Sequence, residues 1–465
     1  MVAIPSILPA ELGHAGVDPD ARPRGAFARL RARLPRDGLN GAGVLAVRLG
    51  GAALAYAAQV IAARYLGQDG FGIYALALVW LTLLGHLSTF GTNQAVTRHV
   101  AQALATGDVG EVRGFLVFGL AFVAAAGLAV GGIAAALLVL APGLVEAAHV
   151  WPLALAVLAT PLLALQDNLE SFARAFDRPM AGIAPPYLIR HGAAIAIFGA
   201  LATSGLVPSP ALAVGAALAA LGISLAVQAA LLVRIVGGRV PAGPRRYRVR
   251  AWMRTALPVA LVDGTEILLL NADVLLVGLF QPPHMVAAYF AASRLAQILD
   301  YVRYAASAAT AQRFAALEAL GRRAELQRLV GYATNATSAV TLLAALALVA
   351  AGEPLLRLFG PDFTVAAPIL PILAGGILAA CLFGPGEDIL SMLGAERACA
   401  AVFAAALGLN LALGFALIPA FGLTGAALAT ALTLVARSVA LAWIAYRRLG
   451  LVLPFGFAWA ARHGG

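Results

Sequence analysis

Stretches of about 20 apolar residues follow one another almost without interruption from Gly41 to Tyr446. A bilayer has a hydrocarbon core about 30 Å thick, which an α-helix of about 20 residues can cross. Lipid offers no hydrogen bonds to the backbone, so stretches of this length can cross it only as helices. The mean hydropathy of +0.89 agrees, and so do the 12% of charged residues, since soluble domains carry about 25%. The chain is therefore predicted to be an all-α, polytopic membrane protein.

The apolar stretches divide into about twelve predicted spans. Their approximate limits are 42–63, 71–92, 114–140, 150–172, 182–204, 210–235, 252–279, 285–308, 329–351, 364–391, 397–418 and 421–446. The tightest junction is the last one, where Pro419 and the glycines Gly422 and Gly425 mark a turn.

Arginine supplies every basic side chain outside histidine, and it gathers in alternate loops. Cytoplasmic loops carry the excess of positive charge, so the arginine-rich side is predicted to be cytoplasmic, with both termini on it. An even number of spans follows, which fits twelve and leaves ten or fourteen open. The position of the basic residues in loops on one side of the membrane accounts for the pI near 10.3. No nucleic acid partner is therefore expected. The arginines of this side include Arg98, Arg113, Arg174, Arg178, Arg234 to Arg254, Arg303 to Arg328, Arg397, Arg447 and Arg448.

An internal repeat indicates two lobes. A shift of 215 positions places Tyr74 on Tyr289 and Arg98 on Arg313. Six spans return the chain to its starting side, so the lobes share one orientation and are related by a pseudo-two-fold axis along the membrane normal. The tail before the first span lacks an apolar segment and is predicted to be retained, not cleaved as a signal peptide. The expected parts are a cytoplasmic tail (1–40), an N-lobe (41–236), a basic cytoplasmic linker (237–250), a C-lobe (251–446) and a second cytoplasmic tail (447–465).

Three arginines inside predicted spans stand out as candidates: Arg48 in the first span, Arg190 in the fifth and Arg294 in the eighth. A charge at the centre of the bilayer costs about 2.5–3.5 kcal/mol, so such residues usually face a cavity or a partner. Guanidinium groups bind phosphate oxygens in a bidentate manner, which makes the three arginines candidate substrate-binding residues. The alternatives are that Arg48 extends to the headgroups and that Arg294 forms a structural ion pair with Asp273.

Acidic residues form a second set of candidates. Asp263, Glu266 and Asp273 lie within an arc of roughly 80° on the seventh span, because successive residues of a helix are about 100° apart. Glu387 and Asp388 follow Gly384-Pro385-Gly386, which is expected to break the tenth span, and broken helices often line transport sites. These five acids are candidates for ion coupling or for balancing the arginines. Pairing for helix assembly is the alternative for the seventh span, and a simple span end is the alternative for the tenth.

Short segments in both halves carry a family resemblance. They include Ala63-Arg64-Tyr65-Leu66-Gly67, Phe71-Gly72-Ile73-Tyr74, Leu358-Phe359-Gly360 and the run from Pro419 to Ala427. In their order and spacing they resemble the Wzx-like polysaccharide and O-antigen flippases of the multidrug/oligosaccharidyl-lipid/polysaccharide (MOP) exporter superfamily. The resemblance implies transfer of a polyprenyl-diphosphate-linked oligosaccharide across the bacterial inner membrane by alternating access, for polysaccharide biosynthesis. It also implies membrane lipids and polysaccharide assembly proteins as partners.

Two other functions are considered. A cation-coupled multidrug or metabolite antiporter of the same superfamily would line its cavity with acids and aromatics, and the acidic seventh span keeps this alternative open. A glycan-assembling enzyme would need a large external loop, but the predicted external loops hold no more than about a dozen residues. Cys381 and Cys399 lack the spacing of a zinc site, and no phosphate-binding loop is present. The sequence therefore predicts a transporter without a catalytic site, metal or cofactor.

Overall fold

The computed structural model describes residues 36–141, 143 and 145–456, all in helices and short connections. The expected tail over residues 1–35 and the last residues of the second tail, 457–465, lie outside the described residues. The chain divides into two units, Met1–Gly43 and Val44–Gly465, and the helical bundle belongs to the second.

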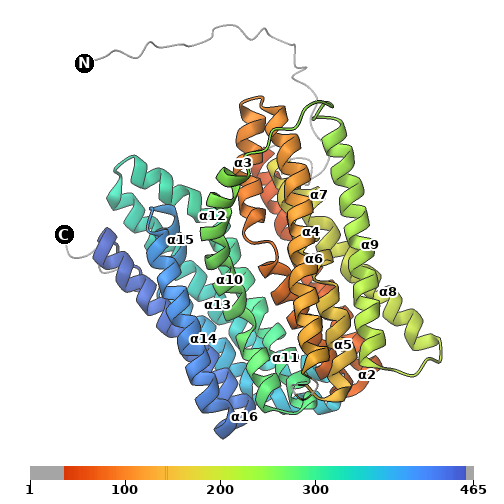
Figure 1. Cartoon of the computed structure of the whole chain (residues 1–465). Coiled ribbons are helices and arrows are strands. Elements are labelled where there is room, and N and C mark those ends of the chain that lie inside the picture. Colours follow the sequence, from red (N-terminus) through yellow and green to blue (C-terminus); the bar gives the residue numbers. More distant parts are fainter. Residues whose placement is uncertain (1–35, 142, 144, 457–465) are drawn as a thin grey trace, which may run out of the picture. The chain divides into compact units, whose positions relative to one another are not determined.

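The helices of the first half begin with α2 and end with α9 (Figure 1). They are α2 (Arg36–Leu87), α3 (Thr92–Ala105), α4 (Val109–Leu140), α5 (Ala147–Leu158), α6 (Thr160–Ala175), α7 (Pro179–Ala184), the π-helical turn η1 (Pro185–Ile189), α8 (Arg190–Thr203) and α9 (Pro210–Gly237). We call residues 44–237 the N-half.

The second half begins with α10, after a connection without helix. Its elements are α10 (Val249–Phe280), α11 (Pro283–Ala296), the 3₁₀ turn η2 (Gln297–Leu299), α12 (Asp300–Ala319), α13 (Arg323–Phe359), the 3₁₀ segment η3 (Pro361–Ile369), α14 (Leu370–Leu382), α15 (Gly386–Met392) and α16 (Glu396–Leu449). We call residues 249–449 the C-half.

Twelve spans can be counted in the part of the chain that the structure describes, as the sequence predicted. Seven helical stretches there are long and apolar enough to cross a membrane as they stand. Two of these, α2 and α16, each hold two spans, because the backbone turns sharply at Gly67 (φ 73°) and Gly422 (φ 56°). A positive φ of this kind is readily adopted only by glycine. Three spans remain. One is α10, which carries three acids; the other two are broken into shorter helices, α7, η1 and α8 in the first half and α11, η2 and α12 in the second.

Proline and glycine explain two helix breaks, one in the fifth span and one in the tenth. Pro185 and Pro186 form the π-helical turn between α7 and α8, because each lacks the N–H that an α-helix needs. The tenth span breaks between α14 and α15, where Gly384 has φ 80° and Pro385 precedes α15. The predicted break in that span is therefore present.

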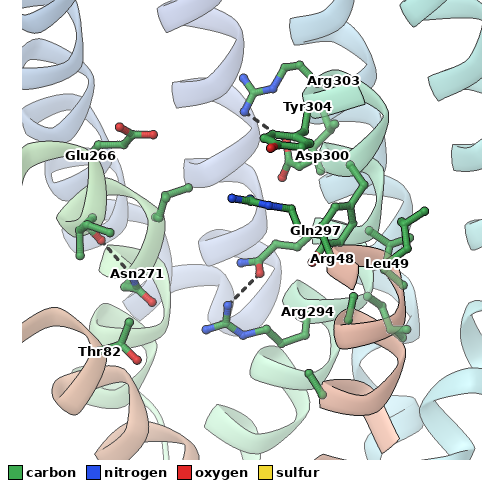
Figure 2. A pocket seen from close by; sticks show the side chains of 18 of the residues that line it. Arg48, Leu49, Thr82, Glu266, Asn271, Arg294, Gln297, Asp300, Arg303 and Tyr304 are labelled. Carbon is green, nitrogen blue, oxygen red and sulfur yellow. Dashed lines mark hydrogen bonds and ion pairs between the residues drawn. The ribbon is translucent and has the colours of Figure 1, made fainter. Parts of the chain in front are cut away.

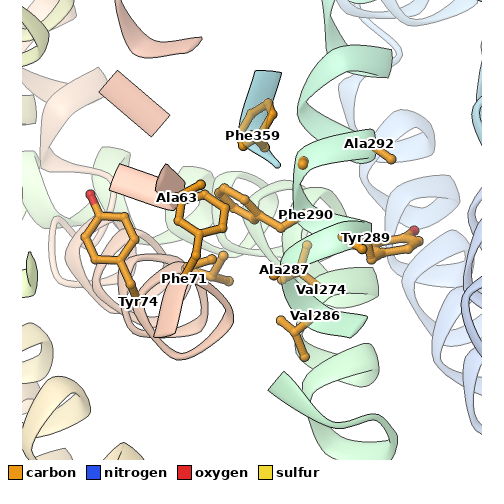
Figure 3. Packing of buried hydrophobic residues seen from close by; sticks show 14 of the residues in the cluster. Ala63, Phe71, Tyr74, Val274, Val286, Ala287, Tyr289, Phe290, Ala292 and Phe359 are labelled. Atoms are coloured by element: carbon orange, nitrogen blue, oxygen red, sulfur yellow. The ribbon is translucent and has the colours of Figure 1, made fainter. Parts of the chain in front are cut away.

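The two halves meet closely at the end of the bundle that holds Gly67, Pro282, Gly360 and Gly422, which we call the arginine-poor end. It is the lower end of the bundle in Figure 1. Phe71 of α2 lies 6.0 Å from Phe290 of α11 and 5.9 Å from Phe359 of α13, between ring centroids (Figure 3). These rings are buried, and their tilted and edge-on geometry is the one aromatic pairs prefer. The arginine-poor end is thus closed by an aromatic core shared between the halves.

The opposite, arginine-rich end is joined mainly through α10. Trp252 near the start of α10 is fully buried among N-half residues, 4.5 Å from the ring of Phe115. Its Nε1 donates a 3.0 Å hydrogen bond to Glu111 of α4, which also pairs with Arg248 at 3.2 Å. His99 of α3 contacts the hydroxyl of Thr255 at 3.0 Å. The first turns of the C-half therefore pack on the N-half.

Candidate functional site

A cavity of about 1140 Å³ lies between the two halves and is lined by side chains of both. Its walls come from α2, α6, η1, α8 and α9 of the N-half and from α10 to α16 of the C-half. Arg48, Arg190 and Arg294, which the sequence placed inside three separate spans, all line it. Of the acidic candidates, Glu266, Glu387 and Asp388 line the cavity, whereas Asp263 and Asp273 are not among its lining residues.

Arg48 is held between two aromatic rings. Its guanidinium carbon lies 4.6 Å from the ring centroid of Tyr304 and 5.3 Å from that of Tyr187. Figure 2 shows Arg48 beside Tyr304 at the cavity wall. Among the described residues its buried Nε has no hydrogen-bond partner. Stacking on aromatic faces attracts a cation without using its hydrogen bonds, so the N–H groups of Arg48 remain available to a ligand.

Arg190 is the first residue of α8 and follows directly on the π-helical turn. Its Nη1 donates a 3.2 Å hydrogen bond to Oε1 of Gln166 on α6. Gln166 is itself oriented by a 2.8 Å bond from its Nε2 to the hydroxyl of Ser224 on α9. The proline pair and this short chain of hydrogen bonds together position Arg190 in the cavity wall.

Arg294 donates a 2.8 Å hydrogen bond from Nη1 to Gln297, and its guanidinium lies over the ring of Phe290 at 4.6 Å (Figure 2). No ion pair joins it to Asp273 within the described chain. Asp273 instead accepts a 2.9 Å bond from the hydroxyl of Tyr289 and a 2.8 Å bond from the backbone N–H of Val274. The structural ion pair considered for these two residues is therefore not formed.

The acids on α10 do not share one environment, although they lie within one arc of the helix. Glu266 lines the cavity, and Figure 2 shows it on the side opposite Arg294. Asp273 is turned toward α11 through Tyr289. Asp388 at the start of α15 accepts a 2.7 Å hydrogen bond from Ser307 of α12. The cavity thus carries acidic groups chiefly on its C-half wall.

Sequence reasoning missed two further cavity arginines, Arg303 and Arg437. Arg303 pairs with Asp300 at 3.4 Å. Arg437 lies well inside the predicted span 421–446. The cost of a charge in the bilayer, which singled out Arg48, Arg190 and Arg294, therefore applied to Arg437 as well. No other pattern in the sequence distinguished Arg303 and Arg437 from the arginines of the loops.

Two family models match the chain. The family model of the polysaccharide biosynthesis proteins matches residues 39–311. The MatE family model matches residues 258–416. A search of curated proteins finds no match.

Several solved structures share the fold. A multidrug resistance MATE family transporter of the MOP superfamily, in an inward-facing conformation, is 13% identical, with 90% of this chain and 99% of that chain covered and a TM-score of 0.71. A MOP superfamily transporter from Pyrococcus furiosus, whose binding pocket is described as of reverse polarity, is 13% identical, with coverage of 87% and 93% and a TM-score of 0.60. The lipid II flippase MurJ, in an inward closed conformation, is 11% identical, with 86% of each chain covered and a TM-score of 0.58.

The resemblance drawn from the sequence and the predicted fold are thus confirmed. The matched family consists of transporters, so the chain is a transporter and not an enzyme. Its fold is the one seen in transporters of the MOP superfamily. With twelve spans, a cavity between its halves and a family match over more than half its length, the chain belongs to the polysaccharide biosynthesis protein family.

Proposed function

We propose that this transporter flips a polyprenyl-diphosphate-linked oligosaccharide across the bacterial inner membrane by alternating access, for polysaccharide biosynthesis. The observation that carries the proposal is the meeting of Arg48, Arg190 and Arg294 in one cavity between the halves. These arginines come from α2, α8 and α11, so the cavity gathers positive charge from both halves.

Three guanidinium groups suit a diphosphate. Charge-assisted bonds from arginine to phosphate are often bidentate and are about twice as strong as neutral hydrogen bonds. Two of the groups, those of Arg48 and Arg294, have a buried Nε without a partner among the described residues. An anion that enters the cavity would satisfy donors that the protein itself leaves open.

In this proposal the N-lobe and the C-lobe move against each other around the site. The aromatic core at the arginine-poor end would hold the transporter closed on that side. The arginine-rich side would be cytoplasmic, in line with the positive-inside rule, with both termini on it. The substrate would enter from the cytoplasmic leaflet, its lipid tail remaining in the bilayer, and polysaccharide assembly proteins would supply and remove it.

The acids keep their proposed role in charge balance or ion coupling. Glu266, Glu387 and Asp388 line the same cavity as the arginines, where carboxylates can exchange protons or accept a guanidinium as the substrate leaves. Asp263 and Asp273 would act from outside the cavity, through the seventh span.

The second candidate is a cation-coupled multidrug or metabolite antiporter. The carboxylates on the C-half wall favour it, because they would attract a cationic substrate. The five arginines of the lining, Arg48, Arg190, Arg294, Arg303 and Arg437, favour the flippase, because they would repel such a cation.

The test measures lipid-linked oligosaccharide in cells that lack the protein and in cells complemented with wild type, Arg48→Ala, Arg294→Ala or the control Arg447→Ala. Arg447 is exposed on α16 and does not line the cavity. We expect intermediates on the cytoplasmic face to accumulate without the protein. Wild type and Arg447→Ala should clear them, whereas the two cavity variants should insert normally and fail. If no intermediate accumulates without the protein, the flippase proposal is wrong and the antiporter takes its place.

A further inference from the structure

Arg437 on α16 is the least solvent-exposed of the cavity arginines. Only 5% of its surface is exposed, yet it lines the cavity. No carboxylate of the described chain forms an ion pair with it, and its Nε has no hydrogen-bond partner there. Its guanidinium lies over the ring of Phe403, at 4.9 Å. A buried charge is normally paired, because desolvation without compensation is costly. The donors of Arg437 are therefore free for a ligand.

Free acceptors lie on the same wall of the cavity. Glu266 of α10, Asp300 of α12 and Glu387 of α15 line the same cavity as Arg437. Within the described residues, Glu266 and Glu387 have neither an ion pair nor a side-chain hydrogen bond, while Asp300 is paired with Arg303. The C-half wall of the cavity thus carries both open carboxylate oxygens, from α10 and α15, and open guanidinium donors, from α16.

The mixed charge decides which ligand this wall suits. A second phosphate would meet the carboxylates of Glu266 and Glu387, and a simple cation would meet the guanidinium groups of Arg303 and Arg437. Sugar hydroxyls carry no charge, and each both donates and accepts hydrogen bonds. Vicinal hydroxyls also match the planar, forked groups of arginine and carboxylate. Neutral sugar is therefore the chemistry that satisfies both sets of open groups at once.

On the basis of the proposed function, we infer that Arg437, Glu266 and Glu387 form a sugar-binding subsite, distinct from the diphosphate site of Arg48, Arg190 and Arg294. The eighth span carries two cavity-lining arginines, Arg294 of the diphosphate site and Arg303. They are nine positions apart, roughly 14 Å along a helix at 1.5 Å per residue. The cavity is therefore long enough along this span for a diphosphate at Arg294 to carry its first sugars into the part of the cavity beyond it.

The experiment measures dissociation constants for two probes with purified full-length protein in lipid nanodiscs. One probe is undecaprenyl diphosphate, and the other is the same lipid carrying a disaccharide of N-acetylglucosamine. The variants are Arg437→Gln, Glu387→Gln and Arg294→Gln. Arg447→Gln is the matched control, because Arg447 also lies on α16 over an aromatic ring, that of Trp443 at 5.4 Å, but outside the cavity.

Wild type should bind the glycosylated probe more tightly than the bare one. Arg437→Gln and Glu387→Gln should each weaken binding of the glycosylated probe about tenfold, as expected for a hydrogen bond to a charged group, and leave the bare probe unchanged. Arg294→Gln should weaken both probes, and Arg447→Gln neither.

Three outcomes overturn the inference. Equal weakening of both probes by Arg437→Gln would make Arg437 another diphosphate ligand, and no effect on either would remove it from the site. Equal affinity of wild type for both probes would exclude a sugar subsite while the proposed function stands. If wild type binds neither probe, the proposed function itself has failed.

A last variant separates a ligand contact from a structural charge. Because Arg437 has no hydrogen-bond or ion-pair partner in the described chain, Arg437→Gln should not lower the melting temperature. If it does, Arg437→Lys keeps the charge without the planar fork. Restored melting temperature with weak binding of the glycosylated probe supports the subsite, and restoration of both assigns Arg437 a structural role.

Discussion

Arg64 of α2 donates a 2.7 Å hydrogen bond from Nε to the backbone carbonyl of Leu358, at the end of α13 in the opposite half. Its Nη2 donates a second bond, of 2.8 Å, to the carbonyl of Arg357. The last carbonyls of a helix have no partner within the helix and carry partial negative charge. One exposed arginine thus joins the two halves at the arginine-poor end.

Replacing Arg64 with glutamine should loosen this end. We expect the free energy that favours the closed state of this end to fall by about 1 kcal/mol, since the bonds are charge-assisted but exposed. The population that is open at the arginine-poor end should then be about fivefold larger. Distances between spin labels at Asp69→Cys and Thr364→Cys, with Cys381 and Cys399 replaced by serine, report this opening. Arg357→Gln is the control, because its side chain pairs with Glu353 on its own helix. Equal distance distributions in wild type and Arg64→Gln would contradict the assignment.

Gly72→Ala should destabilise the protein. A Cβ at Gly72 of α2 would overlap the backbone carbonyl of Pro283 at the start of α11, and backbone cannot yield as a side chain can. Overpacking typically costs about 1–3 kcal/mol, so we expect a lower melting temperature in detergent. Gly132→Ala on α4 is the control, since a Cβ there meets nothing within 4 Å. A melting temperature equal to that of wild type in Gly72→Ala would show that the halves are not packed this closely.

Arg48→Lys should lower transport although the charge is kept. The flat guanidinium of Arg48 stacks between Tyr187 and Tyr304, and lysine provides neither the planar group nor the bidentate fork. We expect about a tenfold slower clearance of lipid-linked oligosaccharide, equivalent to about 1.4 kcal/mol, at normal membrane insertion. Arg447→Lys, outside the cavity, should clear it at the wild-type rate. If Arg48→Lys transported at the wild-type rate, the positive charge of Arg48 would be sufficient and its planar guanidinium would not be needed.

His99 on α3 should make the stability depend on pH. Burial, chiefly, lowers the pKa of His99 below its usual value of 6.5, with Arg98 and Arg248 adding to the effect and Glu111 opposing it. The unfolded chain then binds the proton more readily than the folded one. The stabilisation is therefore fully present above about pH 6.5 and is lost as the pH falls through the lower, folded-state pKa.

Melting temperatures of wild type and His99→Gln between pH 8 and pH 5 check this expectation. The difference between the two proteins should favour wild type less as the pH falls below about 6.5. A difference that is the same at every pH would mean that His99 does not titrate differently in the folded and unfolded states.

The spans were accessible from the sequence because lipid imposes its cost residue by residue, whereas the family was indicated by the resemblance of short segments in both halves. Any run of about 20 apolar residues meets that cost by itself, without reference to its neighbours. The break at Gly384-Pro385 was predictable from an equally local property, because proline has no backbone N–H to donate. Arg48, Arg190 and Arg294 were singled out by an equally local argument, the cost of a charge in the bilayer.

Which charged groups share the cavity was decided only by the tertiary structure. Asp263, Glu266 and Asp273 lie on one face of α10, so the sequence pattern does not distinguish them. In the packed structure only Glu266 of the three lines the cavity. Asp273 has Tyr289 as its partner instead of Arg294, because hydrogen bonds depend on how neighbouring helices are rotated against each other. That Arg437 and Glu387 line one cavity likewise follows from the sharp turn at Gly422 and the packing of α15 on α16. A sequence pattern describes one helix at a time, whereas a binding site consists of several helices whose relative rotation only packing determines.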